Sequence, residues 1–232
     1  MINNEKILLP YFKQLYDKLI NKDFVNDTVE LIGVQIKNLN PLQSIFNFNE
    51  IKKTNKKYCQ KELDWYLSQN LNIAGWVDDI TIWKQISDKD GFINSNYGWC
   101  IFSKENYNQY YNCLEILKKN KNTRQAVMIY NRPEMWYDYN INGMKDWMCT
   151  YSNQFFIRNN KLISLYIMRS NDAIYGFLND FYWACYVYNK LYNELKEIYF
   201  DLEIGYINWY AGSWHLYERH FNLLKQIVES YE

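Results

Sequence analysis

The sequence predicts an α+β protein in which one mixed β-sheet is covered by helices. Segments with the alternating apolar pattern of strands and segments with helical spacing are interleaved, without the regular βαβ order of a parallel sheet. Of the 232 residues, 48% are hydrophobic and only 8 are Gly and 3 are Pro, which excludes a disordered or loop-rich chain. No repeat, linker or charge block divides the sequence, so we expect a single domain over residues 1–232.

The N-terminal half is predicted to supply mainly helices. Residues 7–20 carry leucines at helical spacing and favour an amphipathic helix. Residues 28–36 have a strand pattern in which Gly33 shifts the alternation as a bulge would. Two further segments, 61–68 and 105–119, are predicted to be helical.

The C-terminal half is predicted to supply most of the sheet. Residues 124–130 have the pattern of a buried strand, and residues 152–168 have that of two strands joined at Asn159 and Asn160. Asparagine tolerates the left-handed backbone that a tight hairpin needs. The remaining predicted elements are a long amphipathic helix from Phe177 to Leu195, a strand over 200–210 and a last helix over 216–230.

The charge balance excludes some partners. Lys plus Arg and Asp plus Glu both number 26, so the formal net charge is zero and we expect no direct binding of nucleic acid or of an anionic membrane. No apolar run approaches the roughly 20 residues that span a bilayer. Residues 1–12 lack the core and cleavage site of a signal peptide, and we expect a cytoplasmic protein.

Cysteine and histidine usage argues against a metal site. The five cysteines are odd in number, widely spaced and never in a C-x-x-C pair, so neither a disulfide framework nor a thiolate zinc site is expected. Only His215 and His220 are available as imidazole ligands. One of the cysteines remains a candidate nucleophile.

Cys149 stands where a loop enters a predicted strand, in DWMCTYSNQFF. On spacing alone it is more simply a small buried hydrophobe. A nucleophile would need a nearby cation, because an unperturbed thiol has a pKa of about 8.5. Arg169, at the end of the partner strand of the same hairpin, is the candidate cation.

The run from Met168 to Asp180 is unusually polar for a strand-to-helix junction. Arg169 and Ser170 have the chemistry of a phosphate clamp, while the asparagines and aspartates that follow are equally good turn formers and helix caps. Glu62 is either a buried acid or base or a solvated helix residue. His215 either binds a sugar hydroxyl or satisfies a strand end.

Eight short motifs in one order carry more information than any of them alone. They resemble the thymidylate synthase superfamily, and within it the deoxycytidylate hydroxymethylases of bacteriophages, over most of the chain from Val29 to Phe221. The motifs are ELDWYL, TIW, NSNYGW, NTRQAVMIYNRPEM, NGMKDWMCT, IRNNKL, MRSNDAIYGFLND and GSWHLYERHF.

This resemblance implies a thymidylate synthase-like fold that forms a homodimer by packing sheet against sheet. It implies an enzyme that uses 5,10-methylenetetrahydrofolate and water, and no metal, to convert dCMP to 5-hydroxymethyl-dCMP, in the host cytoplasm if phage-encoded. The alternatives are a dUMP, ribo-CMP or dCMP methylase or hydroxymethylase of the same fold, or a noncatalytic homologue that only binds nucleotide.

The resemblance also implies roles for individual residues. The catalytic group would be the nucleophile Cys149, with Glu62 organising proton transfer and Tyr97 in the proton relay. The folate-side residues would be Asp172 and Trp83. The residues expected to bind the nucleotide are Arg169 and Ser170, Arg124 donated across the dimer interface, Gln154, the sugar-binding pair His215 and Tyr217, and Asp180.

Asp180 is the position that points to the base. In the family, uracil-specific synthases carry asparagine there and cytosine-specific relatives carry aspartate. Two departures concern phosphate binding and water exclusion. The loop before residue 28 is short and lacks an arginine, Gln125 replaces the second arginine of the usual pair, and only eleven residues follow Phe221, so we expect no long C-terminal lid.

Overall fold

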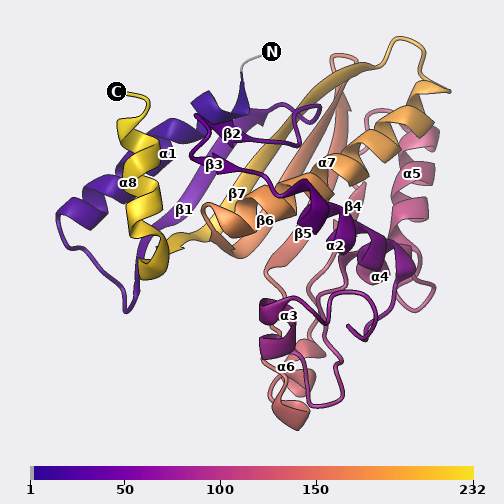
Figure 1. The fold of residues 1–232 in the computed structure, drawn as a ribbon. Coiled ribbons are helices and arrows are strands. Elements are labelled where there is room, and N and C mark those ends of the chain that lie inside the picture. The colour runs from indigo at the N-terminus through magenta and orange to yellow at the C-terminus, as the bar shows by residue number, and fades with distance from the viewer. Residues whose placement is uncertain (1–2) are drawn as a thin grey trace.

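The computed structural model describes residues 3–232, and it confirms a mixed α+β architecture. The first two residues of the predicted single domain of residues 1–232 lie outside the described range. The main sheet has five strands in the order β1-β7-β6-β5-β4 (Figure 1). Within the described range, no helix is long and apolar enough to cross a membrane.

The strands of the main sheet are β1 (Thr28–Leu39), β4 (Val127–Ile129), β5 (Thr150–Arg158), β6 (Lys161–Asp172) and β7 (Glu203–Tyr217). The β6–β7 pair is parallel and the other pairs are antiparallel, so the sheet is mixed as predicted. Asn159 and Asn160, with φ of 50° and 58°, form the predicted hairpin turn between β5 and β6. A small separate sheet pairs β2 (Asn47–Phe48) with β3 (Lys52–Lys53).

Helices cover one face of this sheet, and α7 lies across it (Figure 1). The longest, α7 (Tyr175–Lys196), packs its apolar side on the sheet, as the periodicity from Phe177 to Leu195 predicts. The others are α1 (Asn4–Ile20), α2 (Lys56–Ser68), α3 (Thr81–Ile86), α4 (Tyr97–Phe102), α5 (Gln109–Lys119), α6 (Met135–Asp138) and α8 (Phe221–Glu229), with short 3₁₀ turns at Ile141–Gly143 and Glu218–His220.

Two boundaries near the C-terminus differ from the prediction. The last strand covers 203–217 rather than 200–210, and the last helix begins at Phe221 rather than at residue 216. The reason is that Trp214 and Leu216 are fully buried strand residues that alternate with His215 and Tyr217. The apparent helical spacing at this point is therefore the continuation of a strand.

The shift in alternation predicted at Gly33 is present, but it is not a bulge in pairing. Gly33 has φ of +70°, and the buried positions change phase there from Val29 to Val34. Ile32 nevertheless pairs with Ser213, and Val34 with Ala211, without a register break. The alternation of β7 changes phase at the same level, so the two strands bend together. Beyond this bend β7 carries the polar residues of the candidate site.

Candidate active site

Two groups of polar side chains meet where the first turn of α7 approaches the ends of β5, β6 and β7. One group stands on helices and contains Glu62 of α2, Tyr97 of α4 and Asp180 of α7. The other follows the strands and contains Cys149, Arg169, Ser170 and His215. We call them the helix-borne group and the strand-borne group.

Glu62 is buried, with 5% of its surface exposed. Its Oε1 accepts a hydrogen bond of 2.6 Å from the hydroxyl of Tyr58, one turn earlier in α2, and one of 3.1 Å from Nε1 of Trp83. Burial raises the pKa of Glu62 to about 8, although both hydrogen bonds favour the ionised form. Glu62 is therefore protonated in a large fraction of molecules at neutral pH and can exchange a proton there.

Asp180 is held at both carboxyl oxygens. Asn171 Nδ2 donates to Oδ2 at 2.8 Å, and the Tyr97 hydroxyl lies 3.4 Å from Oδ1. Tyr97 is itself fixed, because its ring stacks on Tyr66 at a centroid distance of 5.1 Å. Burial raises the pKa of Asp180 to about 7 while both contacts oppose the rise. The charge of Asp180 in turn raises the pKa of Glu62.

Cys149 precedes β5 and is partly exposed. The Arg169 guanidinium lies 3.7 Å from its Sγ, and it is anchored by donating to the carbonyls of Trp147 at 2.6 Å and Met148 at 3.0 Å. Burial raises the pKa of the Cys149 thiol to about 11; Arg169 lowers it, while Asp180 raises it further. The resting thiol is thus protonated, and Arg169 is the group that favours its thiolate.

Asp146 holds the loop that carries Cys149. Its Oδ2 accepts from the main-chain N–H groups of Asn94 and Ser95 at 2.7 and 2.6 Å, and its Oδ1 accepts from the Ser95 hydroxyl at 2.6 Å. These bonds tie the loop to the segment that leads into Tyr97 at the start of α4. The candidate nucleophile and the candidate relay tyrosine are thereby positioned relative to each other.

The remaining strand residues form a hydroxyl and imidazole cluster. His215 Nδ1 lies 3.5 Å from the Ser170 hydroxyl and 3.4 Å from that of Ser213, which also donates to Glu30 at 2.7 Å. The ring of Tyr217 stands perpendicular to that of His215 at 5.1 Å. Burial lowers the pKa of His215, and Asp172 opposes this change. A neutral imidazole beside hydroxyls is suited to hydrogen bonding with a polyol or phosphate ester.

The two predicted folate-side residues have structural partners. Asp172 Oδ1 accepts from the main-chain N–H groups of Ile174 and Tyr175 at 2.9 and 2.8 Å, so it caps the turn into α7. Trp83 is 9% exposed and donates to Glu62, as described above. Both side chains border the site, and each of them also orients a neighbouring element.

Arg124 and Gln154 lie apart from the other predicted residues. Arg124 is exposed in the segment before β4, at one edge of the sheet, and its carbonyl accepts from Gln154 Nε2 at 2.8 Å. Gln154 is five residues beyond Cys149 on β5, a separation of roughly 17 Å along a strand. The roles of both residues as nucleotide ligands stay predictions, and for Arg124 the predicted site is that of a second subunit.

Several contacts of the site are not predicted from the sequence. Tyr58 and Asn171 each bond a carboxyl group of the helix-borne group, and Thr150 lies 3.3 Å from the Tyr166 hydroxyl directly behind Cys149. Asn171 is part of the polar run from Met168, where it reads equally well as a turn former. Tyr58 has the only early signal, since it precedes Glu62 by four residues and thus shares its helix face.

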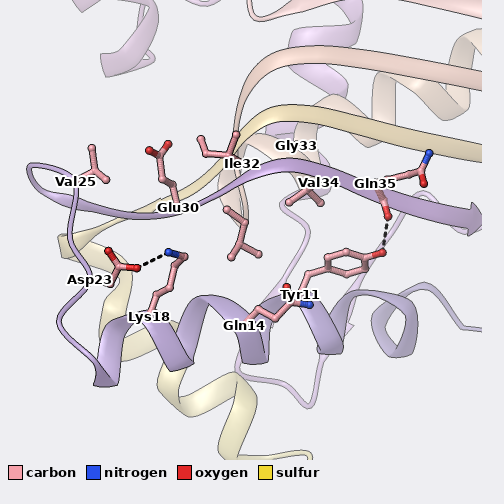
Figure 2. A pocket seen from close by; sticks show the side chains of 11 residues that line it. Tyr11, Gln14, Lys18, Asp23, Val25, Glu30, Ile32, Gly33, Val34 and Gln35 are labelled. Atoms are coloured by element: carbon pink, nitrogen blue, oxygen red, sulfur yellow. Dashed lines mark hydrogen bonds and ion pairs between the residues drawn. The ribbon is translucent and has the colours of Figure 1, made fainter.

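The groove in Figure 2 lies elsewhere in the molecule. It has a volume of about 540 Å³ between α1 and β1, and none of the predicted site residues lines it. Its walls are fixed by the Tyr11 hydroxyl, which donates to the Gln35 carbonyl, and by the ion pair of Lys18 with Asp23. The helix-borne and the strand-borne groups both lie outside this groove.

Comparison with known proteins places this arrangement in context. The sequence model of the family described as thymidylate synthase matches residues 19–231. The chain is 42% identical to the deoxycytidylate 5-hydroxymethyltransferases of Enterobacteria phages T4 and T6 over 218 residues, which cover 89% of this chain and 84% of each relative. It is 26% identical to the thymidylate synthase of Francisella tularensis subsp. holarctica over 196 residues, 80% of this chain and 70% of the relative.

Proposed function

This chain belongs to the thymidylate synthase family, and we propose that it is the one-carbon transferase that converts dCMP to 5-hydroxymethyl-dCMP. The co-substrates are 5,10-methylenetetrahydrofolate and water. The proposal has the support of the phage relatives, which are named deoxycytidylate 5-hydroxymethyltransferases and are similar to this chain over 89% of its length.

The observation that carries the cytosine assignment is the carboxyl of Asp180. A pKa raised to about 7 by burial makes the neutral acid available at physiological pH. A carboxylic acid accepts a hydrogen bond from the 4-amino group of cytosine with one oxygen and donates to ring nitrogen 3 with the other. Nitrogen 3 must gain a proton when a nucleophile adds to carbon 6, and Asp180 is the acid in position to give it.

The strand-borne group supplies the binding of phosphate and sugar. Arg169 and Ser170 offer a guanidinium fork and a hydroxyl, the donors that a phosphate monoester takes up. His215 and Tyr217 offer the hydrogen bonds for the sugar hydroxyl. All four side chains are partly exposed, so a ligand can reach them.

The folate co-substrate fits beside the helix-borne group. It supplies a one-carbon unit at the oxidation level of formaldehyde. Trp83 would provide an aromatic edge for its flat body, and Asp172, which uses Oδ1 for its cap, would offer Oδ2 to an amide or amine donor. Neither side chain requires a metal, and we propose none for this reaction.

The proposed reaction begins with Cys149. Its thiol loses a proton and Sγ adds to carbon 6 of cytosine, which makes carbon 5 nucleophilic enough to take up the one-carbon unit. Arg169, 3.7 Å from Sγ, stabilises the thiolate. Loss of the proton from carbon 5 expels tetrahydrofolate and leaves an exocyclic methylene. Water adds to this methylene, and departure of Sγ restores the aromatic ring.

Glu62 and Tyr97 handle protons in this scheme. With a pKa of about 8, Glu62 exchanges a proton with water near neutral pH, and Tyr58 and Trp83 keep its carboxyl in one orientation. Tyr97 contacts Asp180 and stands close to the base that Asp180 recognises. Water addition at the methylene yields the hydroxymethyl product, whereas hydride transfer from the folate would yield a methyl group.

A homodimer completes the proposal. The sheet face away from α7 carries partly exposed apolar side chains on three adjacent strands: Phe156, Ile163, Leu165, Ile167, Tyr206 and Tyr210. Packing this face against its copy would bury them. Arg124 would then reach the nucleotide of the opposite subunit. We place the enzyme in the cytoplasm, of the host for a phage-encoded protein, and treat residues 1–232 as one domain.

Mass spectrometry of the product tests the assignment. The wild-type protein is incubated with dCMP and methylenetetrahydrofolate, and separately with dUMP and with CMP. We expect a product from dCMP that carries one added hydroxymethyl group, together with release of tritium from [5-³H]dCMP. A methylated product, a preference for dUMP or CMP, or binding without tritium release would each contradict the proposal.

A further inference from the structure

Asn171 lies between the base-reading carboxyl and the core. It is 3% exposed on β6, and its two amide atoms have different partners. Trp209 Nε1, from the neighbouring strand β7, lies 3.2 Å from Asn171 Oδ1. Asn171 Nδ2 donates to Asp180 Oδ2 at 2.8 Å. The residues Trp209, Asn171 and Asp180 thus form one directional chain of hydrogen bonds.

The direction of this chain is dictated by the indole. Trp209 is fully buried, and an indole N–H is a donor that cannot accept. Asn171 must therefore turn its carbonyl oxygen toward Trp209 and its amino group toward Asp180. An amino group cannot accept either, so Asp180 Oδ2 is kept as an acceptor. When Asp180 carries a proton, that proton resides on Oδ1.

The location of this proton decides whether the carboxyl pairs with cytosine or with uracil. A carboxylic acid whose oxygen toward position 4 accepts, and whose hydroxyl faces ring nitrogen 3, matches cytosine. With the proton on the other oxygen, the same acid would donate to the 4-carbonyl of uracil and accept from its N3–H. Asp180 has a pKa of about 7, so its neutral form is populated at neutral pH and an unconstrained proton would let it take both bases.

We propose that Asn171, oriented by Trp209, is a specificity-positioning residue that holds Oδ2 of Asp180 as an acceptor toward position 4 and so makes the site read cytosine and reject uracil. The inference rests on the proposed function, because it concerns how dCMP is distinguished from dUMP. Asn171 acts through Asp180 and need not touch the base.

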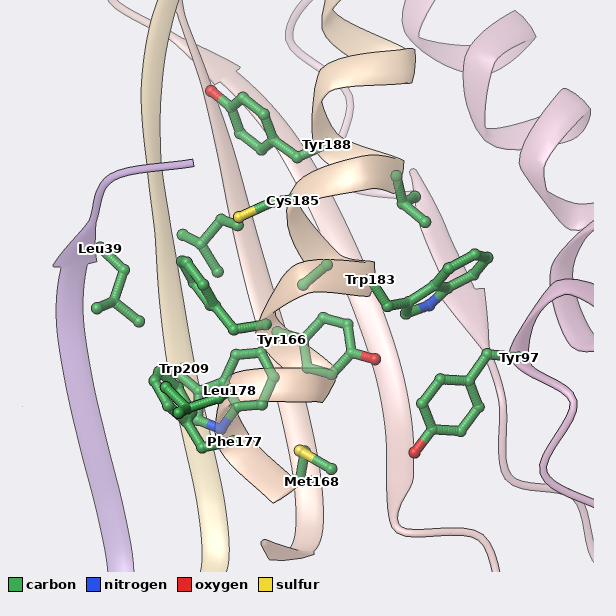
Figure 3. Packing of buried hydrophobic residues seen from close by; sticks show 14 of the residues in the cluster. Leu39, Tyr97, Tyr166, Met168, Phe177, Leu178, Trp183, Cys185, Tyr188 and Trp209 are labelled. Carbon is green, nitrogen blue, oxygen red and sulfur yellow. The ribbon is translucent and has the colours of Figure 1, made fainter. Parts of the chain in front are cut away.

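The packing around the chain keeps it rigid. The Trp209 ring stacks on Tyr166 with a centroid distance of 4.4 Å and an interplanar angle of 8° (Figure 3). The first turn of α7 crosses directly over the Asn171–Asp180 bond at Gly176. A Cβ there would lie 3.3 Å from Asn171 Nδ2 and 3.7 Å from Asp180 Oδ2. Glycine at 176 therefore leaves the room that this hydrogen bond needs.

Asn171→Leu removes the donor and keeps a side chain of similar size. The quantity to measure is the ratio of kcat/KM for dCMP to kcat/KM for dUMP, by tritium release from carbon 5. We expect this ratio to fall about tenfold at about pH 6, where Asp180 is protonated. At about pH 8.5 the carboxyl is ionised, both oxygens are acceptors, and we expect the substitution to change the ratio little.

The pH dependence distinguishes positioning from general damage. Each substrate experiences the same other titrating groups, so their effects cancel in the ratio. The titratable groups coupled to Asp180 lie on every element packed against it: Tyr97 of α4, Tyr58, Cys59, Glu62 and Tyr66 of α2, Tyr166 and Asp172 of β6, and Cys149. A ratio that does not fall at the lower pH, or that falls equally at both, would overturn the inference.

Two further variants serve as control and as second test. Asn153→Leu replaces another fully buried asparagine of the same sheet, which bonds Ser164 rather than Asp180, and it should leave the ratio unchanged. Trp209→Phe retains a ring but frees the Asn171 amide to rotate. We expect a smaller fall in the dCMP to dUMP ratio at about pH 6 than for Asn171→Leu. An unchanged ratio in this variant would contradict the inference even if Asn171→Leu does not fold. Failure of the wild-type protein to process dCMP would instead contradict the proposed function.

Discussion

The helix-borne and the strand-borne groups of the site differ in burial and in charge. Glu62 and Asp180 stand on helices, where burial raises their pKa values to about 8 and about 7. Arg169, Ser170 and His215 stand on strands, are partly exposed, and offer donors and a positive charge. The first group is suited to exchanging protons with a neutral base, and the second to holding an anionic ester. Cys149 belongs to the strand-borne group, and its pKa is influenced by both groups, since Arg169 lowers it and Asp180 raises it.

Removing the proposed nucleophile should have the largest effect of the substitutions considered. Cys149→Ser is expected to lower tritium release from carbon 5 roughly 10³-fold or more, because a hydroxyl without a dedicated base is a far weaker nucleophile than a thiolate. Binding of dCMP, measured by calorimetry, should be largely retained. Cys113→Ser, in the buried side of α5, is the matched control for activity. Near-normal turnover by the Cys149 variant would remove this residue from the mechanism.

Glu62→Gln tests the helix-borne group by removing its proton while keeping its shape. A glutamine Oε1 can still accept from Tyr58 and Trp83, so the geometry is preserved. We expect kcat to fall about 10²-fold or more, the usual contribution of a general acid or base. Little change in kcat, with an intact pH profile between about pH 7 and 9, would assign proton transfer to another group.

The same variant makes a prediction about stability. The folded protein raises the pKa of Glu62 from 4.5 to about 8, so the native state holds the proton more tightly than the unfolded chain. The contribution of Glu62 to the free energy of unfolding is thus fully present below about pH 4.5 and is lost as the pH rises to about 8. Glu62→Gln should therefore raise the Tm relative to wild type more at alkaline than at acidic pH. The opposite trend would mean that Glu62 is ionised in the native state.

Arg124 tests whether the strand-borne group binds phosphate together with a residue of the other subunit. Arg124→Ala should raise KM for dCMP and lower kcat/KM roughly 10- to 100-fold through loss of a charged phosphate contact. Mixing this variant with Cys149→Ser in equal amounts should restore about one quarter of the wild-type activity, since half of the reassorted dimers have one intact site. Asn122→Ala, at another exposed position of the same segment, serves as control. No recovery after verified subunit exchange would show that Arg124 serves its own subunit.

The smallest effect is expected at Gly176, which belongs to neither group but lies next to the carboxyl of Asp180. Gly176→Ala would bring a methyl group within 3.1 Å of Asp172 Cβ and 3.3 Å of Asn171 Nδ2. We expect the dCMP to dUMP preference to fall a few-fold while KM for dCMP changes little, since the strand-borne contacts remain. The measurement is kcat and KM for both nucleotides. A change confined to KM would place the disturbance at the strand-borne group.

The strand-borne group was the easier half to predict from sequence. Arg169 lies beside Cys149 because both are at the open end of one hairpin, whose Asn159–Asn160 turn sets the register of β5 and β6. Local pattern and short connection length are enough for such a prediction. The C-terminal end of the last strand was predicted wrongly, because buried Trp214 and Leu216 resemble the start of the following helix. Of its polar residues, Tyr217 was named only through the family resemblance, whereas His215 was already a candidate for binding a sugar hydroxyl.

The contacts of the helix-borne group are a different case. Glu62 accepts hydrogen bonds from Tyr58 of its own helix α2 and from Trp83 of α3. Asn171 of β6 accepts one from Trp209 of the neighbouring strand β7. No periodicity encodes which buried donor faces which acceptor, since this depends on the tertiary packing. The family resemblance pointed to Asp180 and Glu62 themselves, but not to Asn171 and Tyr58, which bond their carboxyl groups.

Asp180→Asn provides the most direct test of the central claim that the helix-borne carboxyl selects cytosine. An amide cannot give a proton to ring nitrogen 3, so kcat/KM for dCMP should fall and the ratio of dCMP to dUMP should drop by roughly one to two decades. The double variant with Asn171→Leu should shift the ratio further, because the amide at 180 can then turn its amino group toward the 4-carbonyl of uracil. An unchanged ratio in a folded, dimeric Asp180→Asn protein would contradict the account.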